Sequence, residues 1–127
     1  MKNYKIDFEK NNGIVPVIIQ DFETGDVLML AYMDEEAFSL TQSTGHAHYW
    51  SRSKKRIWKK GESSNHIQII REIYLDCDSD TILLKVDQAG GAACHEGYRS
   101  CFFRNIKGDE AMINSKPLFN PDEIYKD

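Results

Sequence analysis

Residues 66–88 read HIQIIREIYLDCDSDTILLKVDQ, two apolar segments separated by the acidic run DCDSD at 76–80. Both segments are rich in branched apolar residues and contain neither Gly nor Pro, which is typical of β-strands. We therefore predict two consecutive strands here and work outward from them.

The segments on the N-terminal side predict a β-hairpin. Residues 14–20 (IVPVIIQ) form a strand, and Pro16 places it at a sheet edge or a bulge because proline has no amide hydrogen to donate. Turn-forming residues at 21–26 (DFETGD) lead into a second strand at 27–33 (VLMLAYM).

A short helix is predicted after this hairpin. Asp34 is suited to cap its N-terminus, and Gly45 is suited to end it. Ala37, Phe38 and Thr41 share the face that would turn inward.

The rest of the chain also favours strands, at 46–52 (HAHYWSR), 55–61 (KRIWKKG) and 99–106 (RSCFFRNI). The fold class predicted is β-rich α+β: one small domain over 1–127, with mixed or antiparallel strands, barrel-like, and one or two short helices. Residues 1–13 form a polar lead-in, and residues 108–127 form a polar tail that wraps the surface or is partly disordered.

Composition limits the classes of function. Of the 127 residues, 41% are hydrophobic and 28% are charged, as in ordinary globular proteins. No apolar run reaches membrane-spanning length and the N-terminus lacks the apolar core of a signal peptide, so we expect a cytoplasmic protein. The net charge of −4 argues against general nucleic-acid binding and leaves room for a local basic site.

Three aspartates at alternate positions, Asp76, Asp78 and Asp80, suggest a site for a hard cation. In an extended chain they share one face while Cys77 points the other way, and Mg²⁺ is the natural counter-ion. An EF-hand loop is a poor alternative, because Thr81 stands where that loop requires Gly. The second alternative is an acidic turn whose carboxylates cap backbone amides.

The three cysteines, Cys77, Cys94 and Cys101, suggest a site for zinc. Three thiolates would leave a fourth position open for water, as in catalytic zinc sites. An odd number of thiols also allows ligands to be shared between chains. His95 is our candidate general acid and base, with a fourth zinc ligand as its alternative. The competing interpretation is three buried apolar thiols.

Residues 50–60 (WSRSKKRIWKK) are basic and aromatic against an acidic background. They suggest phosphate binding and base stacking, or else a solvated strand pair with its tryptophans in the core. His66 is a base, a ligand or a surface histidine. The candidate substrate contacts are Trp50, Ser51, Arg52, Ser53, Lys60, His66 and Arg99.

Together these segments resemble the phosphoribosyl-AMP cyclohydrolase family of histidine biosynthesis. The resemblance covers about residues 14–104 and rests on the combination of YWSRS, WKKGE, DCDSD and ACHEGYRSC. It implies a hydrolase of 1-(5-phosphoribosyl)-AMP that acts as an intertwined homodimer. One departure is Asn65, where the family often has Gly, and Asn tolerates the positive φ that this loop would need. No second catalytic domain follows, so we expect a monofunctional enzyme.

The resemblance also implies the roles of the candidate ligands. Zn²⁺ is held by Cys77, Cys94 and Cys101, shared across the dimer, and Mg²⁺ by Asp76, Asp78 and Asp80. The expected chemistry is attack of zinc-bound hydroxide on C6 of the adenine ring and cleavage of the C6–N1 bond, with His95 transferring protons. Two rivals remain: a zinc nucleobase deaminase, whose HxE and PCxxC motifs are absent, and a zinc-stabilised nucleic-acid-binding module.

Overall fold

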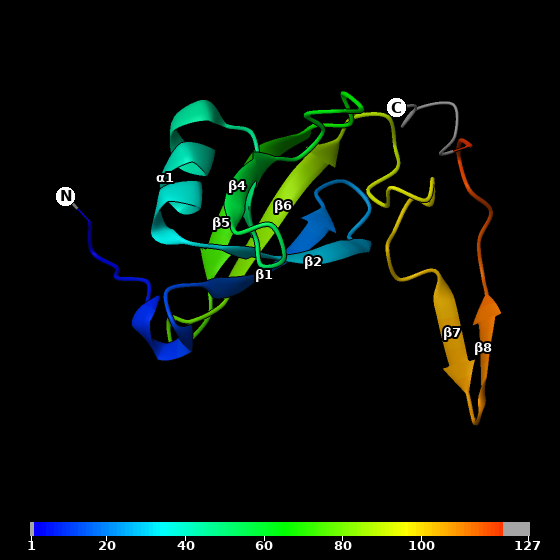
Figure 1. The fold of residues 1–127 in the computed structure, drawn as a ribbon, viewed down its shortest axis with the longest axis horizontal. Helices are drawn as coiled ribbons and strands as arrows, with labels where there is room; N and C mark the ends of the chain where they lie inside the picture. Colours follow the sequence, from blue (N-terminus) through cyan, green and yellow to red (C-terminus); the bar gives the residue numbers. More distant parts are fainter. Residues whose placement is uncertain (1, 121–127) are drawn as a thin grey trace.

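The structure is a computed structural model, and it describes residues 2–120. A mixed four-stranded sheet is its centre (Figure 1). The pairs β1–β2 and β5–β6 are antiparallel, whereas β1 and β6 lie parallel. The order across the sheet is β2 (Val27–Met33), β1 (Val15–Asp21), β6 (Ile82–Gln88) and β5 (Gln68–Leu75). Within the described residues this sheet stays open, so the predicted barrel-like arrangement is not confirmed.

One face of the sheet forms the hydrophobic core. Alternate residues of β1 and β6, including Ile19 and Leu84, are completely buried. They pack with Ala37 of helix α1 (Glu35–Thr44) and Tyr49 of strand β3. Strand β3 (His48–Ser51) pairs with β4 (Arg56–Lys59) in a separate hairpin, as the sequence predicted. Because α1 and this hairpin already cover the core face, the sheet does not need to close on itself.

Helix α1 has the boundaries and inner face that were predicted. Asp34 Oδ1 accepts a hydrogen bond of 2.8 Å from the amide of Ala37, and Gly45 ends the helix at a φ of 76°. Ala37, Phe38 and Thr41 are its buried residues. Together with the short 3₁₀ turn η1 (Glu9–Asn11), it accounts for the one or two helices expected.

Pro16 lies in a strand with neighbours on both sides, which contradicts the expected sheet edge, and the irregular register of this strand falls between Ile19 and Gln20 and not at Pro16. It pairs with Tyr32 of β2, but the parallel ladder to β6 begins only at the next residue, Val17. At Pro16 the strand therefore has a partner on one side only, which is why the missing amide is tolerated there.

The C-terminal part differs most from the prediction. The strand expected at 99–106 begins only at β7 (Arg104–Lys107), and β8 (Glu110–Ile113) follows within the predicted tail. These two strands form an arm that projects from the body (Figure 1). The irregular path before β7 arises because the Cys101 amide binds the Leu28 carbonyl at 2.7 Å. Residues 121–127 of the predicted tail lie outside the described residues.

The lead-in is docked on the body, since Ile6 and Phe8 pack against the core. Among the described residues, no helix is long and apolar enough to cross a membrane.

Candidate active site

The candidate residues gather at opposite ends of the main sheet. Strand β6 starts just after the acidic run and ends before the loop that carries Cys94. Its seven residues span roughly 20 Å. We call one end the acidic end (Asp76, Cys77, Asp78, Asp80 and Arg52) and the other the thiol end (Lys60, His66, Cys94, His95, Arg99 and Cys101). Within one chain, Cys77 is therefore separated from the other two thiols.

The acidic run forms a turn and not the extended segment that was expected. Asp76 Oδ1 accepts hydrogen bonds from the amides of Asp80 (3.0 Å) and Thr81 (3.1 Å), and Ser79 takes a positive φ of 64°. The turn still brings ligand oxygens of Asp76, Asp78 and Asp80 within 4.8 Å of one another. The three carboxylates therefore cluster as expected, but through a turn and not through an extended strand. Asp76 also caps backbone amides, as in the alternative acidic turn.

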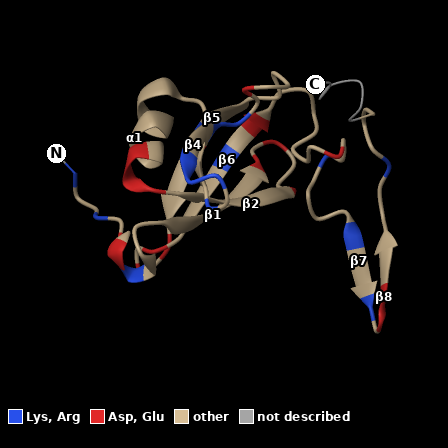
Figure 2. Cartoon of the chain, in the orientation of Figure 1, with Lys and Arg blue, Asp and Glu red and all other residues tan. Residues whose placement is uncertain are grey.

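A lysine of the lead-in supplies positive charge to this cluster. Lys10 Nζ lies 2.8 Å from Asp80 and 3.5 Å from Asp78. Figure 2 shows blue and red segments together in the region of η1. The hydrogen bond from Lys10 lowers the pKa of Asp80 to about 2. Hydrogen bonding to Asp80 and then to Asp76 raises the pKa of Asp78. Lys10 therefore neutralises only part of the negative charge of the three aspartates, and a divalent cation could neutralise the rest.

The tip of the β3–β4 hairpin lies at the acidic end. The guanidinium of Arg52 stacks over the ring of Tyr32, 4.1 Å from its centroid. Ser51 Oγ accepts from the Lys54 amide at 3.1 Å and lies 3.4 Å from Ser53 Oγ. These polar groups are accessible and lie away from the thiol pair of their own chain.

A compact turn brings Cys94 and Cys101 together at the thiol end. The Cys94 amide donates to Tyr98 O and its carbonyl accepts from Gly97, which folds the chain back toward Cys101. Cys94 is 4% exposed, whereas Cys101 as a whole residue is exposed. Burial of its thiol, together with neighbouring Cys94, raises the pKa of Cys101 to about 11. Two neighbouring thiols are soft ligands, and a metal ion that binds them displaces their protons.

Lys60 connects the β3–β4 hairpin to this thiol loop. It is 8% exposed, and its Nζ donates to the carbonyl of Ala93 at 2.6 Å. Burial lowers its pKa, and the thiols of Cys101 and Cys94 partly oppose that shift. The predicted substrate contact is thus held by a structural bond next to the thiol pair.

A cavity of about 240 Å³ opens beside these groups. His95 and Cys101 line it together with Lys60, so the structure brings three of the predicted residues to one cavity. Its further lining includes Met29, Trp58, the polar loop 61–64 and Ala93. Trp58, and not Trp50, is the tryptophan of this cavity. In the sequence, only the polar loop that follows Trp58 indicated that this region could form a site. Nothing in the sequence around Met29 indicated that it lines the cavity.

His66 and Arg99 also lie at the thiol end, in different roles. The imidazole of His66 is packed against Gly90, and its Nδ1 is buried with no hydrogen-bond partner among the described residues. The guanidinium of Arg99 binds Asp21 at 2.8 Å and Asp26 at 3.1 Å, which anchors the thiol loop to the β1–β2 turn. Asn65 has a φ of 64°, which confirms that this loop uses a positive φ that Asn accepts.

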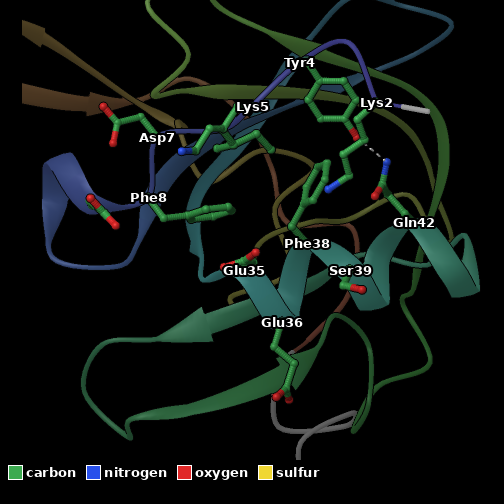
Figure 3. Close-up of a pocket in the computed structure, with 12 residues that line it drawn as sticks. Lys2, Tyr4, Lys5, Asp7, Phe8, Glu35, Glu36, Phe38, Ser39 and Gln42 are labelled. Carbon is green, nitrogen blue, oxygen red and sulfur yellow. Dashed lines mark hydrogen bonds between the residues drawn. The ribbon is translucent and has the colours of Figure 1, made fainter.

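A larger cavity of about 970 Å³ lies elsewhere, between the lead-in and α1. Figure 3 shows Tyr4, Phe8 and Phe38 facing it, with Gln42 bonded to the Tyr4 hydroxyl at 3.1 Å. None of the candidate site residues lines it. The smaller cavity therefore remains the candidate active site.

Comparison with known proteins assigns the chain to a family. The family model described as "Phosphoribosyl-AMP cyclohydrolase" matches residues 29–103. The chain belongs to the phosphoribosyl-AMP cyclohydrolase family. A relative of that name from Desulforapulum autotrophicum is 55% identical over 96% of this chain and 98% of its own length. Others from Nitratidesulfovibrio vulgaris and Methanothrix thermoacetophila are 60% identical (94% of this chain, 95% of theirs) and 58% identical (89% and 90%).

Family membership confirms the resemblance drawn from the sequence motifs. It also identifies the chain as an enzyme of the hydrolase class. The matched residues 29–103 include the acidic run, the three cysteines and His95.

Proposed function

We propose that this chain hydrolyses 1-(5-phosphoribosyl)-AMP in histidine biosynthesis, opening the adenine ring at the C6–N1 bond. The observation that carries the proposal is the cavity in which Cys101 and His95 lie beside the buried Cys94. It gives a cyclohydrolase soft metal ligands and a proton-transfer group in one place. We place the reaction in the cytoplasm, where the three free cysteines would stay reduced.

The donor chemistry of the thiol end fits zinc. Cys94 and Cys101 provide two thiols from one chain, and Cys77 of a second copy would provide the third. Bound zinc would act as a Lewis acid that lowers the pKa of water toward neutrality. Cys77 is exposed, as a ligand offered to another chain must be.

The acidic end fits Mg²⁺. Asp76, Asp78 and Asp80 offer carboxylate oxygens close to one another, which a hard cation prefers. Arg52 lies at the same end with an exposed guanidinium that can bind phosphate in a bidentate manner. We assign to this end the phosphates of the substrate.

The separation of the two ends supports a homodimer. A two-fold symmetric pair can place the acidic end of each chain against the thiol end of the other and so complete two sites. The sheet face opposite the core carries an apolar row across all four strands, formed by cross-strand partners: Leu30, Ile18, Leu83 and Tyr74. Leu30 is 47% exposed and Tyr74 48%. We assign this row to the interface with a second copy.

The arm supports the same arrangement. Ile106, Ala111 and Ile113 share one face of the β7–β8 hairpin, and both isoleucines are exposed. An isolated two-stranded hairpin is at best marginally stable in water, so an apolar face on it calls for a partner.

The chain's own groups account for substrate positioning and proton transfer. His95 is exposed at the cavity beside Cys94, where its imidazole can donate a proton to N1 as the C6–N1 bond breaks. Trp58 offers an aromatic surface to the purine in the same cavity. Lys60 keeps the thiol loop in place through Ala93.

The direct test is an absorbance assay of ring opening with purified protein. We expect turnover of phosphoribosyl-AMP to be lost with a chelator and restored by Zn²⁺ and Mg²⁺ together. His95→Ala should retain zinc but lose turnover, whereas His46→Ala, outside the cavity, should retain both. Full turnover by metal-free protein would exclude the metal-dependent reaction, and full turnover by His95→Ala would exclude the proton-transfer role.

A further inference from the structure

The C-terminal segment 117–119 crosses the thiol end after the arm (Figure 1). The amide of Leu118 donates to the carbonyl of Gly97 at 2.6 Å. The ring of Phe119 contacts the imidazole of His66 edge-on, with centroids 5.0 Å apart and planes at 70°. One short segment thus touches both the loop that carries Cys94 and the loop that carries His66.

Glycines make this close packing feasible. A Cβ on Gly97 would lie 2.2 Å from the carbonyl oxygen of Phe119, and a Cβ on Gly90 would lie 2.4 Å from the imidazole of His66. No side chain fits at such separations without movement of the backbone or the ring. The backbone of the segment therefore packs directly on Gly97, and a single added methyl group at this position would create a clash.

The imidazole of His66 is positioned by shape. It lies between Gly90 and Phe119, and its buried Nδ1 has no hydrogen-bond partner among residues 2–120. Because no bond to that nitrogen fixes the orientation of the ring, packing against Gly90 on one side and Phe119 on the other limits its rotation.

We propose that residues 117–119 form a strap that holds the thiol loop against the His66 loop, with Leu118 and Phe119 as positioning residues for the cyclohydrolase. This inference rests on the proposed function only for the roles of Cys94 and His95. Its contacts with Gly97 and His66 exist independently of those roles.

The test compares three variants of the 127-residue chain, and the second readout adds a fourth. Phe119→Ala removes the aromatic contact, and Gly97→Ala pushes the strap away through its backbone. Gly13→Ala is the matched control, because Gly13 has a φ of 96° against 94° for Gly97 and a Cβ there meets nothing within 4 Å. Strain from a positive φ is thus similar in the two alanine variants, and only one disturbs the strap.

The first readout is alkylation of Cys94 in chelator-treated protein, followed by mass spectrometry of the peptides. Cys94 is buried, so its alkylation rate in the folded protein is compared with its rate in the same variant unfolded in urea. We expect alkylation of Cys94 to accelerate about threefold to tenfold in Phe119→Ala and Gly97→Ala, the range of an aromatic contact expressed as an equilibrium ratio. Gly13→Ala should match the parent protein.

The second readout is the split between kcat and KM. A strap that positions His66 and the thiol loop predicts a fall in kcat with little change in KM for Phe119→Ala, and Phe119→Tyr should restore kcat. Unchanged alkylation of Cys94 in both strap variants would overturn the proposal, and so would equal acceleration in Gly13→Ala. Because alkylation needs neither zinc nor substrate, this result stands even if the proposed metal chemistry fails.

Discussion

Lys60 Nζ lies 2.6 Å from the carbonyl oxygen of Ala93 and so joins residues 33 positions apart in the chain. The bond links the end of the β3–β4 hairpin to the residue that precedes Cys94. The charge of the Lys60 ammonium also opposes the rise that burial causes in the pKa of Cys101. Lys60 therefore has a structural and an electrostatic effect on the same loop.

Replacing Lys60 should weaken the protein and its thiol end together. Lys60→Met retains an apolar stem but leaves the Ala93 carbonyl without its donor. We expect the free energy of unfolding to fall by roughly 1.5–3 kcal/mol, the range for a hydrogen bond to a charged group. Urea denaturation measures it, with exposed Lys54→Met as the control. Equal losses in the two variants would show that the Ala93 bond contributes nothing specific.

The lowered pKa of Asp21 predicts that the free energy of unfolding decreases in acid. Burial of its carboxylate opposes ionisation, but hydrogen bonds from the amides of Thr24 and Glu23 and from Arg99 outweigh it and lower the pKa of Asp21. Because the folded pKa lies below the unfolded value of 3.8, the stabilisation is present above that value. It is lost as the pH falls through the folded pKa.

The measurement is the free energy of unfolding between pH 7 and pH 3, for the parent protein and for Asp21→Asn. We expect Asp21→Asn to be less stable at pH 7 and the difference to shrink on acidification. Asp109→Asn in the exposed arm is the control. A difference that stays constant over this range would exclude Asp21 as a source of the acid sensitivity.

Lys10 should compete with Mg²⁺ for the acidic end. Its ammonium lies 2.8 Å from Asp80, where a cation bound by the three carboxylates would be repelled. We expect Lys10→Met to lower the melting temperature without metal and to tighten Mg²⁺ binding up to about fivefold, the size of a surface ion pair. The Mg²⁺ dependence of the melting temperature reports both effects, with Lys5→Met as the control. Weaker Mg²⁺ binding by Lys10→Met would contradict the competition.

The apolar row on the uncovered sheet face predicts a variant that dissociates. Leu30→Lys places a charge in the apolar row of the proposed interface, where burial of an unpaired ammonium is costly. We expect monomers in sedimentation and at least a tenfold loss of turnover, since each site would lose the second chain's ligand. Ser39→Lys on the exposed side of α1 should remain dimeric and active. A fully active Leu30→Lys monomer would disprove the shared site.

Local patterns in the sequence were sufficient to predict the helix and the strand pairs. Asp34 and Gly45 carry the signals that bound the ten residues of α1, and β5 and β6 differ from their flanks in composition. Pro16 was misjudged because the point at which β6 joins β1 depends on residues far along the chain. The turn at 76–80 depends on Asp76 accepting hydrogen bonds from two backbone amides. The sequence was compatible both with this turn and with an extended strand.

The candidate ligands were also readable from residue types, but their contacts were not. Arg99 was expected to bind substrate, yet its partners Asp21 and Asp26 lie more than 70 residues away in sequence. Lys10 gave no motif at all, and only the folded lead-in brings it to the acidic end. Long-range ion pairs have no local signature, because each partner is a common surface residue until the fold brings the two together.

Mixing two inactive variants tests the shared zinc site most directly. In a symmetric dimer with Cys77 acting in trans, a Cys77→Ala chain paired with a Cys94→Ala chain has one site that lacks both thiols and one that is complete. After the two proteins are unfolded together and refolded, half of the dimers are mixed and half of their sites are intact, so about one quarter of the parent activity should return.

If all three thiols acted within one chain, every site in the mixture would lack a cysteine, and no activity would return. Zinc content distinguishes the cases independently of turnover, because intact sites should bind zinc tightly and sites with two thiols weakly. The positions of Cys77 and Cys94 at opposite ends of β6 favour recovery. A mixture that stayed inactive while forming mixed dimers would exclude a zinc site that is completed by Cys77 of the second chain.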